Sequence, residues 1–172
     1  MQVLKILREE DVGESFPTPH SYIERTTARA VVFDTDDNIA LLHVTRKEHH
    51  KLPGGGVEEG ESIGEALTRE LIEEIGCAVT DVCELGMIEE YRNKTAKHQI
   101  SYCFTAQVSG EKGTPSLDAS EINDGIETVW MGLEDAIRLL EQESRSMDSY
   151  GAKFMSLREL AFLKEAHQTR VS

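Results

Sequence analysis

Three glutamates, Glu70, Glu73 and Glu74, are spaced so that a helix would place them side by side on one face. Like charges at this spacing repel one another, at a cost of a few tenths of a kcal/mol when they are exposed. Carboxylate oxygens together with water are the ligands that Mg²⁺ and Mn²⁺ prefer. The spacing therefore predicts a divalent metal site, and the alternative is a solvated acidic helix face.

The segment that carries these glutamates is expected to be a helix over residues 63–75. Ser62 and Glu65 form the pattern of a capping box at its start, and Gly76 stands where a C-terminal cap glycine belongs. Every fourth residue is apolar, which predicts a buried stripe of Leu67, Leu71 and Ile75.

Three glycines, Gly54, Gly55 and Gly56, follow Pro53 just before this helix. Because glycine has no side chain, the backbone of such a run can approach a ligand closely, as it does in phosphate-binding loops. The glycine run and the acidic helix together favour a metal and phosphate site over a merely solvated surface.

The spacing of these residues resembles the signature box of the Nudix hydrolase family. Gly55 is followed after five residues by Glu61, and after seven more by the run 69–76. All charged and glycine positions of the family pattern are present, and Cys77 departs from it because a bulky aliphatic residue is usual there. The resemblance covers residues 55–77 in detail, and the order of strands and helices fits roughly over residues 26–143. It implies a Nudix-type α/β/α sandwich with a mixed β-sheet.

The resemblance implies hydrolysis of a nucleoside diphosphate linked to another group, by attack of water on phosphorus with Mg²⁺ bound and Mn²⁺ as a substitute. By the matching positions, Glu70 and Glu74 would hold the metal, and Glu73 would share that role or act as the base. Glu61 and a carbonyl of Gly54 or Gly55 would complete the metal surroundings. Arg69 would orient a glutamate by an ion pair.

In some family members the base lies outside the box, on a later loop. Glu121 and Glu127 are the candidates for this position, and Glu127 is included among the predicted catalytic residues with Glu70, Glu73 and Arg69. The alternative is that both later glutamates are ordinary surface residues.

The predicted substrate contacts combine the glycines with nearby cations. Two stretches, residues 43–51 and 91–98, are basic in an otherwise acidic chain. Cations near a glycine loop readily meet phosphate. The predicted substrate-binding residues are Gly55, Gly56, Arg46, Lys51 and Arg92. The alternative for the cations is that they only balance the acidic surface.

The sequence narrows the substrate by exclusion. Motifs that mark the NADH, coenzyme A and ADP-ribose branches of the family are absent. A nucleoside triphosphate, oxidised or not, of the MutT type is therefore expected, with a dinucleoside polyphosphate as the alternative. A non-catalytic nucleotide-binding regulator and an isoprenoid diphosphate isomerase are other outcomes on the same fold, but no box glutamate is missing.

Composition indicates one soluble domain. The 172 residues carry a net charge of −14, which argues against binding to nucleic acid or anionic membranes. There is no apolar run long enough to span a membrane and no signal-peptide pattern. Three cysteines without a CxxC spacing are expected to be buried thiols in a cytoplasmic protein. A small-molecule nucleotide is the expected partner, and a homodimer is left open.

The chain is expected to form a single domain, residues 1–172, with an N-terminal arm over residues 1–25, a core over 26–143 and a C-terminal helical part over 144–172. Strands are predicted at residues 3–7, 27–33, 39–45, 79–90, 98–108 and 127–131, the second and third of them as a buried hairpin. Residues 45–51 and 109–120 are expected to be irregular connections. Two more helices are predicted at residues 133–143 and 148–166.

Overall fold

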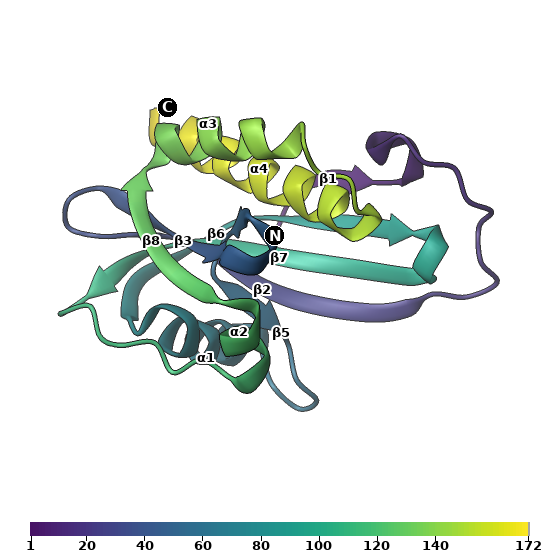
Figure 1. Cartoon of the computed structure of the whole chain (residues 1–172). Coiled ribbons are helices and arrows are strands. Elements are labelled where there is room, and N and C mark those ends of the chain that lie inside the picture. The colour runs from purple at the N-terminus through teal and green to yellow at the C-terminus, as the bar shows by residue number, and fades with distance from the viewer. Residues whose placement is uncertain (172) are drawn as a thin grey trace.

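A mixed sheet of eight strands lies between two layers of helices in the computed structural model, which describes residues 1–171 (Figure 1). The main path of the sheet runs β1 (Val3–Leu7), β6 (Ala78–Arg92), β7 (Lys97–Ser109), β2 (Ile23–Phe33), β3 (Asn38–Val44) and β4 (His49–Lys51). Two further strands join it: β5 (Gly54–Gly56) pairs with β2, and β8 (Ile126–Gly132) pairs with β3. Because β1 with β6 and β2 with β7 are parallel and the other pairs antiparallel, the predicted mixed sheet is confirmed.

Helices α1 (Ile63–Ile75) and α2 (Ala119–Asp124) lie on one side of the sheet, and α3 (Leu133–Ser144) and α4 (Tyr150–Val171) on the other (Figure 1). Alternation along β2 divides the core between them. Ala28, Ala30 and Val32 pack toward α1, whereas Val31 and Phe33 pack toward α3 and α4. Three short 3-10 turns complete the elements: η1 (Glu9–Val12), η2 (Thr45–Lys47) and η3 (Asn93–Thr95).

The predicted helix over residues 63–75 is confirmed to the residue. Ser62 accepts a hydrogen bond from the amide of Glu65, and the Glu65 side chain accepts one from the amide of Ser62. Gly76 ends the helix in the left-handed conformation. The predicted stripe of Leu67, Leu71 and Ile75 is buried.

The predicted hairpin of residues 27–33 and 39–45 is largely absent. β2 and β3 share only the pair of Phe33 and Ile39 next to their turn. The strands then diverge, because the glycine strand β5 pairs with β2 at residues 27–29 and β8 pairs with β3 over residues 38–44.

Two segments expected to be irregular contain regular structure. Residues 49–51 form β4, because they pair with β3. The loop predicted over residues 109–120 gives way to α2 at Ala119. Asp118 and Glu121 cap this helix reciprocally, so the D-x-x-E spacing is the local signal for it.

The strand predicted at residues 3–7 is confirmed as β1, and its pairing with β6 joins the N-terminal arm to the sheet. Cys77 and Cys103 are buried, but Cys83 is exposed, so the expectation of three buried thiols is wrong for Cys83. No helix among residues 1–171 is long and apolar enough to cross a bilayer.

Candidate active site

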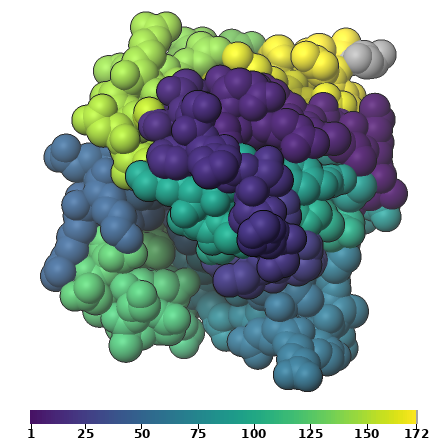
Figure 2. Space-filling model, turned by 90° about the vertical axis from the view of Figure 1, so that its right-hand side faces the viewer, coloured from purple at the N-terminus to yellow at the C-terminus, as the bar shows by residue number. Residues whose placement is uncertain are grey.

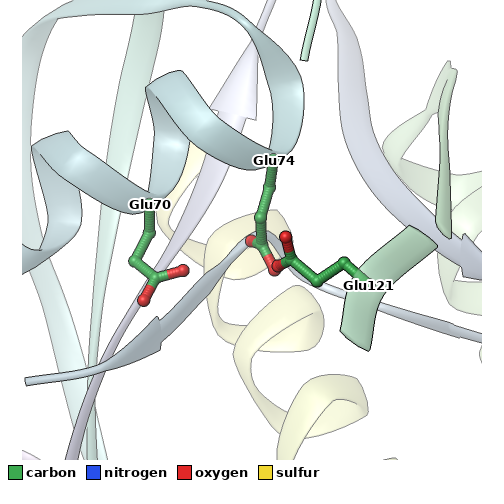
Figure 3. A group of neighbouring side chains, drawn as sticks. All are labelled: Glu70, Glu74 and Glu121. Atoms are coloured by element: carbon green, nitrogen blue, oxygen red, sulfur yellow. The ribbon is translucent and has the colours of Figure 1, made fainter. Parts of the chain in front are cut away.

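Three carboxylates from two helices meet beside the glycine strand (Figure 3). Glu70 and Glu74 lie one turn apart on α1, and Glu121 comes from α2. One oxygen of each lies within 4.8 Å of an oxygen of the other two. We call Glu70, Glu74 and Glu121 the carboxylate group. Oxygens so close together repel unless a cation lies among them, and they form a donor set that suits a hard divalent ion.

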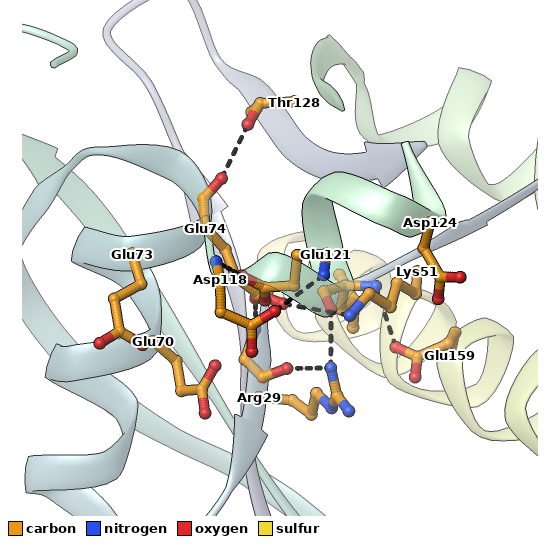
Figure 4. Close-up of polar contacts among 12 residues, drawn as sticks. Arg29, Lys51, Glu70, Glu73, Glu74, Asp118, Glu121, Asp124, Thr128 and Glu159 are labelled. Carbon is orange, nitrogen blue, oxygen red and sulfur yellow. Dashed lines mark hydrogen bonds and ion pairs between the residues drawn. The ribbon is translucent and has the colours of Figure 1, made fainter. Parts of the chain in front are cut away.

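Glu74 is the buried member of the carboxylate group, with a side chain that is 1% exposed. The amide of Gly54 donates to its Oε2, and the Lys51 ammonium donates to its Oε1 at 3.1 Å (Figure 4). Burial raises the pKa of Glu74 and outweighs the opposing charges of Lys51 and Arg29. A further positive charge at this point would stabilise the ionised carboxylate, as a metal ligand requires.

The glycine strand makes room for these side chains. A Cβ on Gly55 would lie 2.2 Å from Oε1 of Glu70, so any side chain there would displace that carboxylate. Gly54 has φ of +124°, and a Cβ on it would lie 2.1 Å from the carbonyl oxygen of Ala28. Gly54 therefore allows the strand to pack against β2, and Gly55 admits Glu70.

Arg69 connects the glycine strand to the acidic residues of the box. Its guanidinium donates to both carboxylate oxygens of Glu61, at 2.9 and 3.0 Å, and to Glu70 at 2.9 Å. It also reaches Glu73 at 3.3 Å and the carbonyl of Gly56 at 3.0 Å. These bonds raise the pKa of Arg69, and the same contact lowers the pKa of Glu61. Arg69 therefore forms ion pairs with Glu61, Glu70 and Glu73, and its role in orienting a glutamate for catalysis stays a prediction.

Glu73 and Glu127 lie outside the carboxylate group. Glu73 is 44% exposed and contacts Arg69. Glu127 is exposed on β8 and pairs in register with His43. Of the two later glutamates singled out from the sequence, the structure brings Glu121 to the site and leaves Glu127, the one chosen, outside it. The tertiary contact between α2 and the box could not be read from local spacing.

The carbonyl of Gly54, predicted as a metal ligand, accepts a hydrogen bond from Nη1 of Arg29. The same nitrogen donates to the carbonyl of Leu52 at 3.1 Å, so Arg29 holds the turn that leads into the glycine strand. Arg29 is 7% exposed, and its Nε has no hydrogen-bond partner. The sequence signal for this residue is a lone arginine within the apolar run 28–33.

The three predicted substrate-binding cations have different surroundings. Lys51 contacts Glu74 and therefore borders the carboxylate group. Arg46 is exposed and donates to Asn123 at 3.2 Å, near the end of α2. Arg92 is 13% exposed and donates to Glu90 at 2.6 Å beneath α4. Only Lys51 lies directly at the site.

Comparison with known proteins identifies the family. A family model described as the NUDIX domain matches residues 24–168. An uncharacterised Nudix hydrolase from Bacillus subtilis is 39% identical over 113 residues, which cover 60% of this chain and 70% of that protein. Rat diphosphoinositol polyphosphate phosphohydrolase 2 is 32% identical over 111 residues, which cover 63% of this chain and 57% of that protein.

The zebrafish 8-oxo-dGDP phosphatase NUDT18 is 26% identical over 161 residues, covering 87% of this chain and 47% of that protein, so the chain spans about half the length of this relative. Among solved structures, a Nudix hydrolase from Nitrosomonas europaea has a TM-score of 0.62 at 22% identity, covering 86% and 90% of the two chains. A MutT Nudix hydrolase from Burkholderia pseudomallei has a TM-score of 0.53 at 24% identity, and the match covers 65% of this chain and 85% of that one. The structures show the shared fold, and the match over residues 24–168 shows that the chain belongs to the Nudix family.

Proposed function

We propose that this protein hydrolyses a phosphoanhydride bond in a small, nucleotide-like substrate and that it requires Mg²⁺, with Mn²⁺ as a substitute. The observation that carries the proposal is the carboxylate group, in which oxygens of Glu70, Glu74 and Glu121 lie within 4.8 Å of one another. All donors are carboxylate oxygens, which fits a hard divalent cation.

Glu70 and Glu74 would hold the metal, with Glu74 as the buried ligand, and Glu121 would lie beside it. When bound, the metal neutralises charge on the phosphoryl group and makes a nearby water more acidic. Lys51, which contacts Glu74, adds a positive charge at the edge where the substrate's phosphates would lie.

A carboxylate of this chain must also accept the proton of the attacking water. Glu121 is the better placed of the later glutamates, because it lies in the carboxylate group and its Oε2 accepts a 2.8 Å bond from the amide of Asp118, which restrains its orientation. Glu73, the base candidate within the box, is more exposed and contacts Arg69. Arg69 would position Glu70, and its 2.9 Å bond to Oε1 of Glu70 supports this role.

The starting candidate for the substrate is a nucleoside triphosphate or an oxidised nucleotide, and the named activity of the zebrafish relative on 8-oxo-dGDP supports this choice. A dinucleoside polyphosphate is the alternative from sequence. The name of the rat relative adds diphosphoinositol polyphosphates as a further substrate class. A purely regulatory nucleotide binder is disfavoured, because the acidic residues needed for catalysis are retained.

The test is a library of nucleotides and diphosphoinositol polyphosphates incubated with the full chain and Mg²⁺, followed by measurement of released phosphate or pyrophosphate. Hydrolysis of one class that is lost in EDTA and lowered by orders of magnitude in Glu74→Gln is expected. Glu134→Gln, on the exposed face of α3, is the matched control and should retain activity. Full activity in EDTA, or in Glu74→Gln, would refute the proposal.

A further inference from the structure

A cluster of cations occupies the α4 side of the sheet at the end where β2 and β7 begin. Arg29 and Val31 of β2, Cys103 of β7 and Ile88 of β6 face this side, and alternation places further residues of the same strands beside them. The cations on this side are Arg25 and Arg29 from β2, Arg92 from β6, Lys97 from β7 and Arg158 from α4. Among residues 1–171, two carboxylates pair with these cations, Glu90 and Glu159.

Most of these cations are already satisfied. Arg158 pairs with both buried carboxylates, at 2.7 Å to Glu90 and at 2.5 Å to Glu159. Arg92 pairs with Glu90, and Arg29 donates to backbone carbonyls. Three of the five cations therefore have hydrogen-bond partners within the protein. Because the five cations outnumber the two carboxylates that pair with them, the cluster has an excess of positive charge.

Arg25 and Lys97 carry that excess. Among residues 1–171, neither has a carboxylate within 4.0 Å, although the chain as a whole is strongly acidic. Although Arg25 is an exposed residue, partial loss of hydration and the charges of Arg29, Arg158 and Arg92 lower its pKa. Loss of hydration and the charges of Arg25 and Arg92 lower the pKa of Lys97 in the same way. In the β2–β7 register Lys97 lies opposite Ile23, and Arg25 lies opposite Gln99, so the two cations are offset by two residues on adjacent strands. Two like charges so placed repel each other, and an anion bound beside both would relieve this repulsion.

This excess charge lies close to the proposed reaction centre. Nη2 of Arg25 is 3.9 Å from the position that a Cβ on Gly56 would occupy, and Glu70 attracts the Arg25 guanidinium. Nη1 of Arg92 is 3.9 Å from the corresponding position on Gly151 at the start of α4. Figure 2 looks onto this end of the molecule, and its surface is hollowed between the segment near residue 47 (blue), the region of α2 (green) and the strands β6 and β7 (teal).

We propose that Arg25 and Lys97 form a phosphate-binding subsite, with Arg92 at its edge, for phosphate groups of the substrate that are not part of the anhydride being cleaved. The inference rests on the proposed function and narrows the class of substrate. The substrate is then a small molecule with clustered phosphates, because a single anhydride held at the carboxylate group would leave both cations unpaired. Guanidinium and ammonium groups bind phosphate oxygens through short charge-assisted hydrogen bonds.

The test separates binding from catalysis by working in EDTA with a ligand that has no anhydride. Inositol hexakisphosphate is the probe with clustered phosphates, and AMP is the probe with one phosphate. Isothermal titration of the full chain should show the hexakisphosphate binding at least tenfold more tightly than AMP, with an affinity that falls as salt is raised. Arg25→Ala and Lys97→Ala should each weaken its binding about tenfold, whereas Arg25→Lys should retain part of the affinity.

Arg138→Ala is the matched control, because Arg138 is an exposed arginine of α3 paired with Asp135 and Glu134. Thermal denaturation of each variant checks that it is folded. Equal affinities for the two probes would overturn the subsite. Unchanged binding of the hexakisphosphate in both Arg25→Ala and Lys97→Ala would overturn it too. So would a loss of hexakisphosphate affinity in Arg138→Ala equal to that in the subsite variants. If the library screen finds hydrolysis but the subsite variants bind normally, the subsite fails and the function stands. If binding behaves as expected but no anhydride is cleaved, the function fails and the subsite stands.

Discussion

The buried carboxylate of Glu159 in α4 accepts a 3.1 Å hydrogen bond from the backbone amide of Leu52, 107 residues earlier in the chain. Leu52 begins the turn into the glycine strand, and Arg29 holds its carbonyl from the other side. The amide of Gly54 then reaches Glu74 in the carboxylate group. The C-terminal helix is thus connected to the proposed metal site through the turn at residues 52–54, which bonds to Glu159 at one end and to Glu74 at the other.

The first prediction concerns this connection. Glu159→Gln should lower the stability of the protein by about 1–3 kcal/mol, because it removes one of the two carboxylates that pair with the buried Arg158. It should also raise the Mg²⁺ concentration needed for half-maximal activity, since the turn at Leu52 loosens. Chemical denaturation and Mg²⁺ titration of activity are the measurements. Glu141→Gln, which removes an exposed pair with Lys164, is the control, and equal behaviour of the two variants would count against the connection.

The second prediction separates the two later glutamates. Glu121→Gln should lower kcat by about 10²- to 10⁴-fold, because it removes a member of the carboxylate group. Glu127→Gln should have kinetics close to those of the unmodified protein, because Glu127 is exposed on β8. Steady-state kinetics on the best substrate of the screen measure both. The reverse pattern would restore Glu127 as the catalytic residue.

The third prediction concerns the glycine strand. Gly55→Ala should greatly reduce activity in a folded protein, because the added Cβ would lie 2.2 Å from Oε1 of Glu70 and displace the carboxylate. Gly64→Ala is the matched change: nothing lies within 4 Å of its added Cβ, and it sits in α1. That control should keep activity and gain up to about 1 kcal/mol of stability. Wild-type kinetics in Gly55→Ala would show that this close approach does not matter for catalysis.

The fourth prediction is a pH dependence of stability at Asp34, which is 3% exposed and pairs with Lys112 at 2.6 Å. Burial acts to raise the pKa of Asp34, but the bond from Lys112 and the amides of Asn38 and Asp36 outweigh it, so the pKa is lowered. A lowered pKa in the folded state means that the ionised carboxylate contributes stability above its unfolded pKa of about 4, and that this contribution is lost as the pH falls through the folded value.

Asp34→Asn should therefore lower the free energy of unfolding by about 1–2 kcal/mol at pH 7. The difference from the unmodified protein should shrink steadily below pH 4. Urea denaturation across this pH range is the measurement, with the exposed Asp36→Asn as control. A difference that stays constant down to pH 2 would contradict the assignment.

Local interactions explain what the sequence alone determined. The helix over residues 63–75, its caps and its apolar stripe depend on contacts within four residues, so their spacing was sufficient to predict them. The four-residue spacing of Glu70 and Glu74 likewise placed both side chains on one face of α1. The resemblance in the box identified the family, which the comparison with known proteins confirmed.

Contacts between distant segments decided the rest. Glu121 joins Glu70 only because α2 packs beside the box, and the hairpin predicted for β2 and β3 opened because β5 and β8 take their edges. Pairing of charges follows the same rule: Arg92 pairs with Glu90, whereas Arg25 and Lys97 have no carboxylate within 4.0 Å in the part of the chain that the structure describes. A charge in a sequence has no fixed partner, because its neighbours are set by strand register and by the helix that covers the sheet. Tertiary structure alone therefore determined which cations have a carboxylate partner within the protein.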